Sequence, residues 1–329
     1  MSALDSILPL MPDNLRKLLS GIAAPIANQL QEIRIREGRP LEIVYSFGHR
    51  FVTPTGQTTE DAEQGYVPNR EDTARLLDLL SGHSLYAFEE ELKRGYITVR
   101  GGHRIGIAGR TVLDQGSVRQ IRDVASFNIR LAREVKGAGV KLLPLIADRK
   151  WHTVHHTLII SAPQRGKTTL ARDLSRLISH GDWSALGVTW KARKVAIVDE
   201  RSELAACVRG VPSFDVGPRT DVLDGCPKAE GMMMMIRSMS PEVIVVDEIG
   251  RAEDAEAIEE AMHAGIRVIA TAHGNGLSDI VKRPVLRSLI HGKRFERLVV
   301  LDSLADPGTI SGVYDADGHP VRPALLTKV

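Results

Sequence analysis

The chain has 329 residues, of which 43% are apolar and only 4% are aromatic. This length and composition suffice for two domains with largely aliphatic cores. A formal net charge of +2 argues against a general polyanion-binding protein. No apolar run approaches the ~18 residues of a membrane span, and the amino terminus lacks a signal-peptide pattern. We therefore expect a soluble, cytoplasmic protein.

The first part of the chain is typical of a small α+β domain. Between glycine-rich turns it has short β-branched or alternating runs, at residues 32–36, 41–45, 95–100, 103–110 and 128–135. Leucine spacing predicts a helix over residues 70–81. The sequence Lys-Gly-Ala-Gly at 136–139 predicts a linker. We therefore expect an N-terminal α+β domain at residues 1–136 and a second domain at 137–329.

Strand and helix patterns alternate in the second part, which indicates an α/β domain with a mostly parallel sheet. Apolar runs predict strands at residues 155–160, 194–198, 243–246, 266–270 and 297–301. A helix over 252–264 would make a right-handed crossover between the third and fourth strands. A terminal hairpin is expected to turn at Asp317-Gly318. Ligands of such sheets bind at the carboxyl ends of the strands.

The sequence SAPQRGKT at 161–168 joins an apolar strand to an amphipathic helix, which is typical of a phosphate-binding P-loop. Lys167 supplies an amine for the β- and γ-phosphates, and Thr168 supplies a hydroxyl for Mg²⁺. The usual first glycine of the motif is Ser161 here, a residue with less backbone freedom. We expect nucleotide contacts from Ser161, Ala162, Pro163, Gln164, Arg165, Gly166, Lys167, Thr168 and Thr169.

A second phosphate-handling motif follows the P-loop after about 80 residues. The β-branched run at 243–246 ends in Asp247 and Glu248, as in a Walker B strand. Asp247 is expected to hold Mg²⁺ directly or through water, and Glu248 to orient the water that attacks the γ-phosphate. The two motifs together predict a Mg²⁺-dependent ATPase.

Three further polar residues lie at or beside predicted strand ends. Glu200 is a candidate for positioning water, and the alternative is a structural ion pair with Arg201. His273 could sense the γ-phosphate, or it could be a core histidine with satisfied hydrogen bonds. Arg237 could neutralise transition-state charge across a subunit interface. The same role is open to Arg104, Arg110, Arg130, Arg133 and Arg251.

The order of several motifs resembles the stage III sporulation protein AA family. These motifs are EIRIREGRPL (32–41), GYITVRGGHRIGIAGR (95–110), SFNIRLAREVKG (126–137), PQRGKTT (163–169), VDERSEL (198–204), MIRSMSPEVIVVDEIGR (235–251) and ATAHG (270–274). The resemblance implies the secretion and pilus-retraction ATPase superfamily, in which an N-terminal domain precedes a RecA-like ATPase domain and six copies form a ring. It also implies that Glu200 lies in an acidic box, His273 in a histidine box and Arg237 in an arginine signature.

The resemblance further implies that ATP hydrolysis powers a transenvelope channel during endospore formation, together with membrane proteins. A protein without a membrane span would act there by docking onto a partner, through its N-terminal domain. Two alternatives stay open. One is a nucleic-acid-binding ATPase, against which the near-neutral charge argues. The other is a non-hydrolysing nucleotide-binding scaffold, to which Ser161 points.

Overall fold

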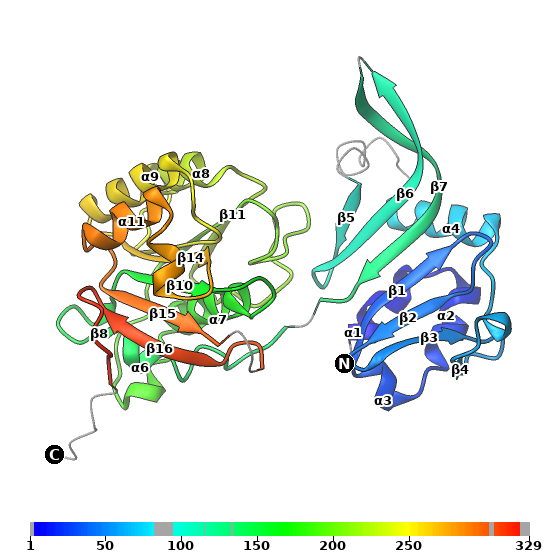
Figure 1. The fold of residues 1–329 in the computed structure, drawn as a ribbon, viewed down its shortest axis with the longest axis horizontal. Helices are drawn as coiled ribbons and strands as arrows, with labels where there is room; N and C mark the ends of the chain where they lie inside the picture. The colour runs from blue at the N-terminus through cyan, green and yellow to red at the C-terminus, as the bar shows by residue number, and fades with distance from the viewer. Residues whose placement is uncertain (1–2, 82–94, 115, 133, 303–305, 323–329) are drawn as a thin grey trace. The chain divides into compact units, whose positions relative to one another are not determined.

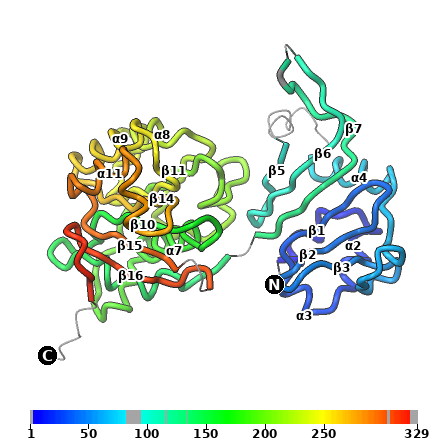
Figure 2. Tube along the Cα trace, in the orientation of Figure 1, coloured from blue at the N-terminus to red at the C-terminus, as the bar shows by residue number. Residues whose placement is uncertain are grey.

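The computed structural model describes residues 3–81, 95–114, 116–132, 134–302 and 306–322. The chain divides into two compact units, Met1–Arg133 and Glu134–Val329 (Figure 1). In Figure 2 the colour runs along the chain from blue in the first unit to red in the second. The division lies three residues before the boundary expected at 136. Each unit has a sheet of its own.

The first unit is built on a seven-stranded antiparallel sheet in the order β4-β3-β2-β1-β7-β6-β5. Its strands are β1 (Leu30–Arg36), β2 (Glu42–Tyr45), β3 (Gly48–Val52), β4 (Thr58–Thr59), β5 (Tyr96–Val99), β6 (His103–Asp114) and β7 (Ser117–Arg130). The helices described in this unit are α1 (Ala3–Ile7), α2 (Asp13–Ser20), α3 (Ala24–Ala27) and α4 (Arg70–Ser81).

Side-chain alternation along the strands gives this sheet one apolar and one polar face. In β1 the side chains of Ile33 and Ile35 are fully buried, whereas Arg34 and Arg36 lie on the opposite face. The buried side chains pack in one cluster with leucines of α1, α2 and α4. The helices therefore cover one face of the sheet, and arginines occupy the other.

The helix predicted over residues 70–81 is confirmed by α4. The strand predicted over 128–135 is wrong in its extent, because β7 begins at Ser117 and ends at Arg130. Strands β6 and β7 form one long hairpin, which projects beyond its neighbouring strands in Figure 1. Its register shifts at Gly109, where an added Cβ would lie 2.6 Å from the carbonyl oxygen of Arg122. This bulge bends the hairpin.

The second unit is built on a seven-stranded sheet in the order β12-β11-β13-β14-β10-β15-β16. The strands pair in parallel except for β16, which is antiparallel to β15. They are β10 (Thr157–Ser161), β11 (Val195–Asp199), β12 (Thr220–Asp224), β13 (Val243–Val246), β14 (Arg267–His273), β15 (Arg297–Leu301) and β16 (Ile310–Asp315). A separate short pair consists of β8 (Ala147–Asp148) and β9 (Thr153–Val154).

Helices cover both faces of this sheet. The described helices are α6 (Leu143–Ile146), α7 (Lys167–His180), α8 (Lys228–Ser238), α9 (Ala252–His263), α10 (Leu277–Ile280) and α11 (Pro284–His291). One core cluster contains α6 and α7 side chains, and the other contains side chains of α8, α9, α10 and α11. The central strands are therefore buried on both sides, which explains their continuous apolar runs.

Strands occur at each of the five predicted positions, with ends shifted by up to three residues, and α9 confirms the helix predicted over 252–264. The terminal hairpin turns at Asp317-Gly318 as expected, since Asp315 N donates to His319 O at 2.9 Å. Its first strand, β16, pairs mainly with β15. The strand β12 is an addition to the predicted set, and it completes the edge of the sheet beside β11.

Candidate active site

The P-loop joins the end of β10 to the start of α7. Gly166 caps the helix with a left-handed φ of 86°, and Gln164 also has a positive φ of 61°. The first N–H groups of a helix have no partner within the helix and so favour an anion. Ser161 belongs to the extended strand and pairs with His273 of β14, so this position does not need the freedom of glycine.

Lys167, the first residue of α7, is only 4% exposed. Its Nζ lies 3.0 Å from His273 Nδ1 and 3.8 Å from Glu248 Oε1. His273 Nε2 lies 2.7 Å from the same oxygen of Glu248. A neutral histidine with its proton on Nε2 satisfies both contacts, because Nδ1 then accepts from the ammonium. Side chains from the P-loop, β14 and the end of β13 thus meet in one cluster.

Thr168 and Asp247 form the second contact between the P-loop and β13. Thr168 Oγ1 donates to Asp247 Oδ2 at 2.8 Å, and Thr271 Oγ1 donates to Asp247 Oδ1. The predicted Mg²⁺ ligands therefore lie side by side at the start of α7. Mg²⁺ is usually held by one or two protein oxygens together with substrate phosphates and water. The hydroxyl and carboxylate present here fit that requirement.

The backbone of Glu248 explains how its side chain reaches the P-loop. Its φ is 54°, a left-handed value that is uncommon for a residue with a side chain. Glu248 N donates to Thr271 Oγ1 at 2.9 Å, and Ile249 N donates to Thr271 O at 2.9 Å. The neighbouring strand β14 therefore fixes the bend at the end of β13. Such strain often accompanies functional sites.

The acidic segment after β11 is organised by Asp199, which is 1% exposed. Its carboxylate accepts hydrogen bonds from Glu203 N at 2.9 Å and Ala205 N at 2.8 Å. Burial raises the pKa of Asp199 to about 6, and the negative charges of Asp224 and Asp247 add to the effect. Asp199 therefore shapes the loop that follows it.

Glu200 and Arg201 each have a partner that differs from the expected alternative. Glu200 pairs with Lys228 at the start of α8, and not with Arg201. Arg201 Nη1 instead lies 2.8 Å from Glu248 Oε2. The sequence pattern pointed to neither pair, because both join segments far apart in the chain.

Arg172 of α7 is a further residue that sequence reasoning missed. Its guanidinium is buried, donates to Leu204 O and to Glu203 O, and lies 4.0 Å from the ring centroid of Phe214. Burial lowers its pKa from the usual value, although nearby carboxylates oppose the shift. Arg172 ties the P-loop helix to the acidic segment. In the sequence it is indistinguishable from a solvated helix arginine.

The structure does not bring Arg237 to this cluster within one unit. Arg237 is exposed near the C-terminal end of α8, whereas Lys228 begins that helix beside Glu200. A helix of this length separates its ends by roughly 16 Å. Arg251 is exposed at the start of α9. Of the other candidates, Arg133 lies outside the described residues, and the rest belong to the first unit: Arg104, Arg110 and Arg130.

The turn of the P-loop also touches the segment that precedes β16. Gly308 N donates to Arg165 O at 2.9 Å. A Cβ added to Gly166 would lie 2.9 Å from Gly308 N. The close approach of the two backbones therefore requires glycine at position 166 in addition to its positive φ.

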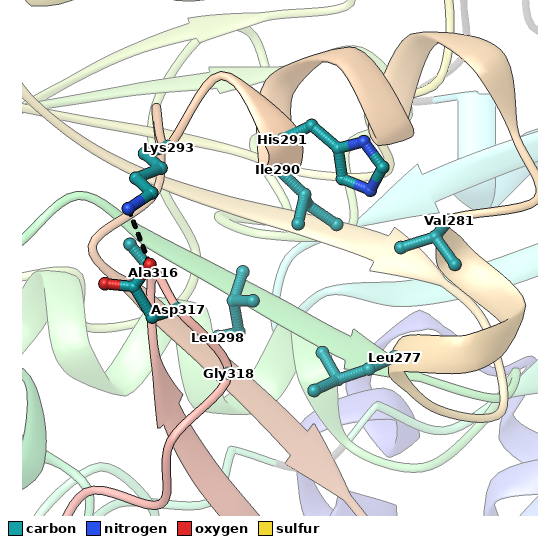
Figure 3. A pocket seen from close by; sticks show the side chains of 9 residues that line it. All are labelled: Leu277, Val281, Ile290, His291, Lys293, Leu298, Ala316, Asp317 and Gly318. Atoms are coloured by element: carbon teal, nitrogen blue, oxygen red, sulfur yellow. Dashed lines mark ion pairs between the residues drawn. The ribbon is translucent and has the colours of Figure 1, made fainter.

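Two cavities of the second unit lie away from these residues. One of about 370 Å³ is lined by Leu277, Val281, Ile290 and Leu298, with the Lys293–Asp317 ion pair at its rim (Figure 3). The other, of about 530 Å³, is lined in part by Trp151 and Arg193. Both lack the P-loop and Walker B residues. Of the helices in the described ranges, none combines the length and hydrophobicity needed to span a bilayer.

Two solved structures have a fold similar to that of this chain. The pilus retraction motor PilT with bound ADP has a TM-score of 0.55 at 14% identity, with 90% of this chain and 80% of that chain covered. The ATPase DotB of Legionella pneumophila has a TM-score of 0.53 at 16% identity, with 89% and 75% covered. At such identities the likeness supports the fold alone.

The relationship in sequence is much closer for a sporulation protein. Stage III sporulation protein AA of Bacillus subtilis (strain 168) is 46% identical over 316 residues, which cover 96% of each chain. The model of the family described as "Sporulation stage III, protein AA" matches residues 1–321. The chain therefore belongs to the stage III sporulation protein AA family.

Proposed function

We propose that the protein hydrolyses ATP at the P-loop of its second unit, which is a RecA-like ATPase domain. The observation that carries the proposal is the meeting of Lys167, His273 and Glu248 at distances of 2.7 to 3.8 Å. An amine for phosphates and a carboxylate for water are parts that phosphoryl transfer to water uses, and His273 contacts both of them here. They come from three separate elements, so chance proximity in sequence does not explain them.

Substrate binding would redistribute the partners of Lys167. The β- and γ-phosphates would lie at the N-terminal end of α7, where Lys167 exchanges its contact with Glu248 for phosphate oxygens. Thr168 and Asp247 would hold Mg²⁺, which when bound neutralises charge on these phosphates. His273 contacts both Lys167 and Glu248, so it is placed to respond when this contact changes.

Glu248 is the residue that we assign to the attacking water. It accepts contacts at both carboxylate oxygens, and Oε1 would lose one of its two partners, and so could accept a water proton, when Lys167 moves to the phosphates. Glu200 is the second candidate for this role. Its carboxylate is paired with Lys228, which ties it to the start of α8. Glu200 therefore supports the site from one side in this proposal.

Membership of the family supports a role in sporulation. We infer that the protein works as a homohexameric ring that powers a transenvelope secretion or channel complex together with membrane proteins. Two proteins of similar fold support this inference, because one is the pilus retraction motor PilT and the other is the ATPase DotB. The first unit would dock onto neighbouring copies or onto a membrane partner, so that the protein is cytoplasmic and peripheral to the membrane. Its net charge of +2 gives little support to the nucleic-acid alternative.

The experiment that tests this function measures ATP turnover with Mg²⁺ against protein concentration, with sizing of the same samples. We expect specific activity to rise from nanomolar to micromolar protein as rings assemble, and Lys167→Ala to remove it. Constant specific activity of a monomer would contradict the ring and favour a monomeric nucleotide switch. ATP binding without turnover at any concentration would favour the non-hydrolysing scaffold.

A further inference from the structure

We propose that Arg201 is a positioning residue for hydrolysis, which holds Glu248 through carboxylate oxygen Oε2 while Oε1 orients the water. This inference rests on the proposed ATPase function. It assigns a role within one chain to an arginine of the segment between β11 and β12. Glu248 would then depend on a cation from its own chain as well as on the P-loop.

The two oxygens of Glu248 have different partners. Oε1 lies 2.7 Å from His273 Nε2 and 3.8 Å from Lys167 Nζ. Oε2 lies 2.8 Å from Arg201 Nη1. When phosphate takes over the ammonium of Lys167, Oε1 loses a partner and can accept a water proton. We expect the contact of Arg201 with Oε2 to persist and to fix the plane of the carboxylate.

Contacts of the residues on either side of Arg201 hold this segment in place. Asp199 accepts from Glu203 N, and Ser202 Oγ donates to Asp224 Oδ1 at 2.6 Å. Glu200 is paired with Lys228 on the preceding side. Residues whose supporting contacts are fixed in advance orient a reacting group at little further entropic cost.

Exposure separates this role from a role in folding. The side chain of Arg201 is 61% exposed, whereas that of Glu248 is 17% exposed. An ion pair with one largely exposed partner contributes little to the free energy of unfolding. Truncation of Arg201 would leave solvent in its place and no cavity in the core. A large effect on turnover would therefore come from the orientation of Glu248.

The test compares steady-state turnover and ATP affinity of the full chain in the wild-type protein and in five variants. Arg201→Ala should lower kcat roughly 10-fold or more, since small displacements of a catalytic group are costly, and leave the Kd for ATP within about threefold. Arg201→Lys should recover part of the loss. Arg209→Ala, an exposed arginine in the same connection, is the matched control and should keep wild-type kcat. Arg201→Ala combined with Glu248→Gln should be no slower than Glu248→Gln alone.

Each other outcome has a distinct meaning. Wild-type kcat in Arg201→Ala, or an equal further loss in the double variant, would overturn the assignment and leave the ATPase function intact. A weaker Kd with unchanged kcat would overturn it too, because Arg201 would then bind nucleotide directly. Absence of turnover in the wild-type protein overturns the proposed function and this inference together. Circular dichroism and thermal melting of each variant verify that its fold is unchanged.

Discussion

The two units use sheets of the same size in opposite ways. Both sheets have seven strands, but one is antiparallel and the other is parallel except for β16. In the parallel sheet the carboxyl ends of β10, β11, β13 and β14 all lie on one side, which is the carboxyl end of the sheet. This is where Lys167, Asp199, Glu248 and His273 gather. In the antiparallel sheet successive strands end on opposite sides. Its polar side chains spread over one face instead.

The face of the first sheet shows this spreading directly. Arg104 and Arg130 are directly opposite each other on β6 and β7, and Arg34 lies opposite Asn128 on the neighbouring pair of strands. Arg104 stacks on the ring of Tyr96 at 3.6 Å. The relative direction of the strands, and not their number, therefore determines whether polar side chains gather at the strand ends or spread over one face of the sheet.

The largest effect expected is the loss of ATP binding in Lys167→Ala. If phosphate is bound only at the carboxyl end of the parallel sheet, the substitution should weaken ATP binding by at least roughly 10²-fold, to below detection, because a buried charged contact is removed. Titration with a fluorescent ATP analogue measures it. Lys293→Ala, which breaks a surface pair with Asp317, is the control and should bind normally. Micromolar or tighter binding by Lys167→Ala would refute the P-loop assignment.

The antiparallel unit should show an acid sensitivity of its own through His103. Ala132 N donates to His103 Nδ1 at 3.1 Å, and Ser6 Oγ lies 2.6 Å from Nε2. Burial lowers the pKa of His103 to about 4. His103 therefore takes up a proton near pH 6.5 in the unfolded chain but only near pH 4 in the folded unit. Stability should fall as the pH drops from about 6.5 to about 4, by up to about 3 kcal/mol.

Urea unfolding followed by circular dichroism measures this dependence. His103→Gln should be less stable at neutral pH but should lack this part of the acid slope, because glutamine takes up no proton. The control His49→Gln changes an exposed histidine of the same unit and should keep the wild-type slope. Equal slopes in the wild-type protein and in His103→Gln would show that His103 is not the group responsible.

Among the carboxylates at the carboxyl end of the parallel sheet, hydrolysis should depend most on that of Glu248. Glu248→Gln should lower kcat roughly 10²-fold, the usual loss for a catalytic acid or base, and keep ATP affinity within a few-fold. Glu200→Gln should have a much smaller effect, since Glu200 is paired with Lys228. Single-turnover kinetics separate the two. If Glu200→Gln has the larger effect, the water-positioning role moves to Glu200.

The smallest effect expected is complementation between subunits. It would indicate that the first unit also contributes a residue to hydrolysis. If an arginine of the first unit completes a neighbour's site, Arg130→Ala should be inactive alone. Mixed with Lys167→Ala it should regain a fraction of wild-type activity, because some interfaces then combine an intact P-loop with an intact arginine. Arg119→Ala, on the exposed end of the β6–β7 hairpin, is the control. Failure to complement while mixed oligomers form would exclude Arg130.

Sequence patterns predicted the buried elements better than the edge elements. The central strands of the second unit are apolar on both faces, and their runs are visible without any structure. The edge strand β12 is only partly buried and carries Asp221 and Asp224, so its pattern resembled a loop. The helices α1 and α3 are of five and four residues, too short for a periodic signal.

In the candidate site, the residues that belong to motifs could be predicted, whereas the contacts between distant segments could not. The meeting of Lys167, Thr168, Asp247 and Glu248 could be predicted because both motifs place these residues at strand ends of one sheet. The partners of Arg201 and Glu200 could not. Each pair joins segments that lie far apart in the chain, and residue types alone do not encode which of these segments meet.

The backbone contact between Gly166 and Gly308 links two positions that lie far apart in the gene. A methyl group at 166 would press against the segment before β16 even with no nucleotide bound. Impaired activity of a Gly166→Ala protein would therefore reflect the spacing of two loops as much as phosphate recognition. Natural variation at the two positions should be correlated for the same reason. A lineage could enlarge residue 166 only after the segment around Gly308 had moved away.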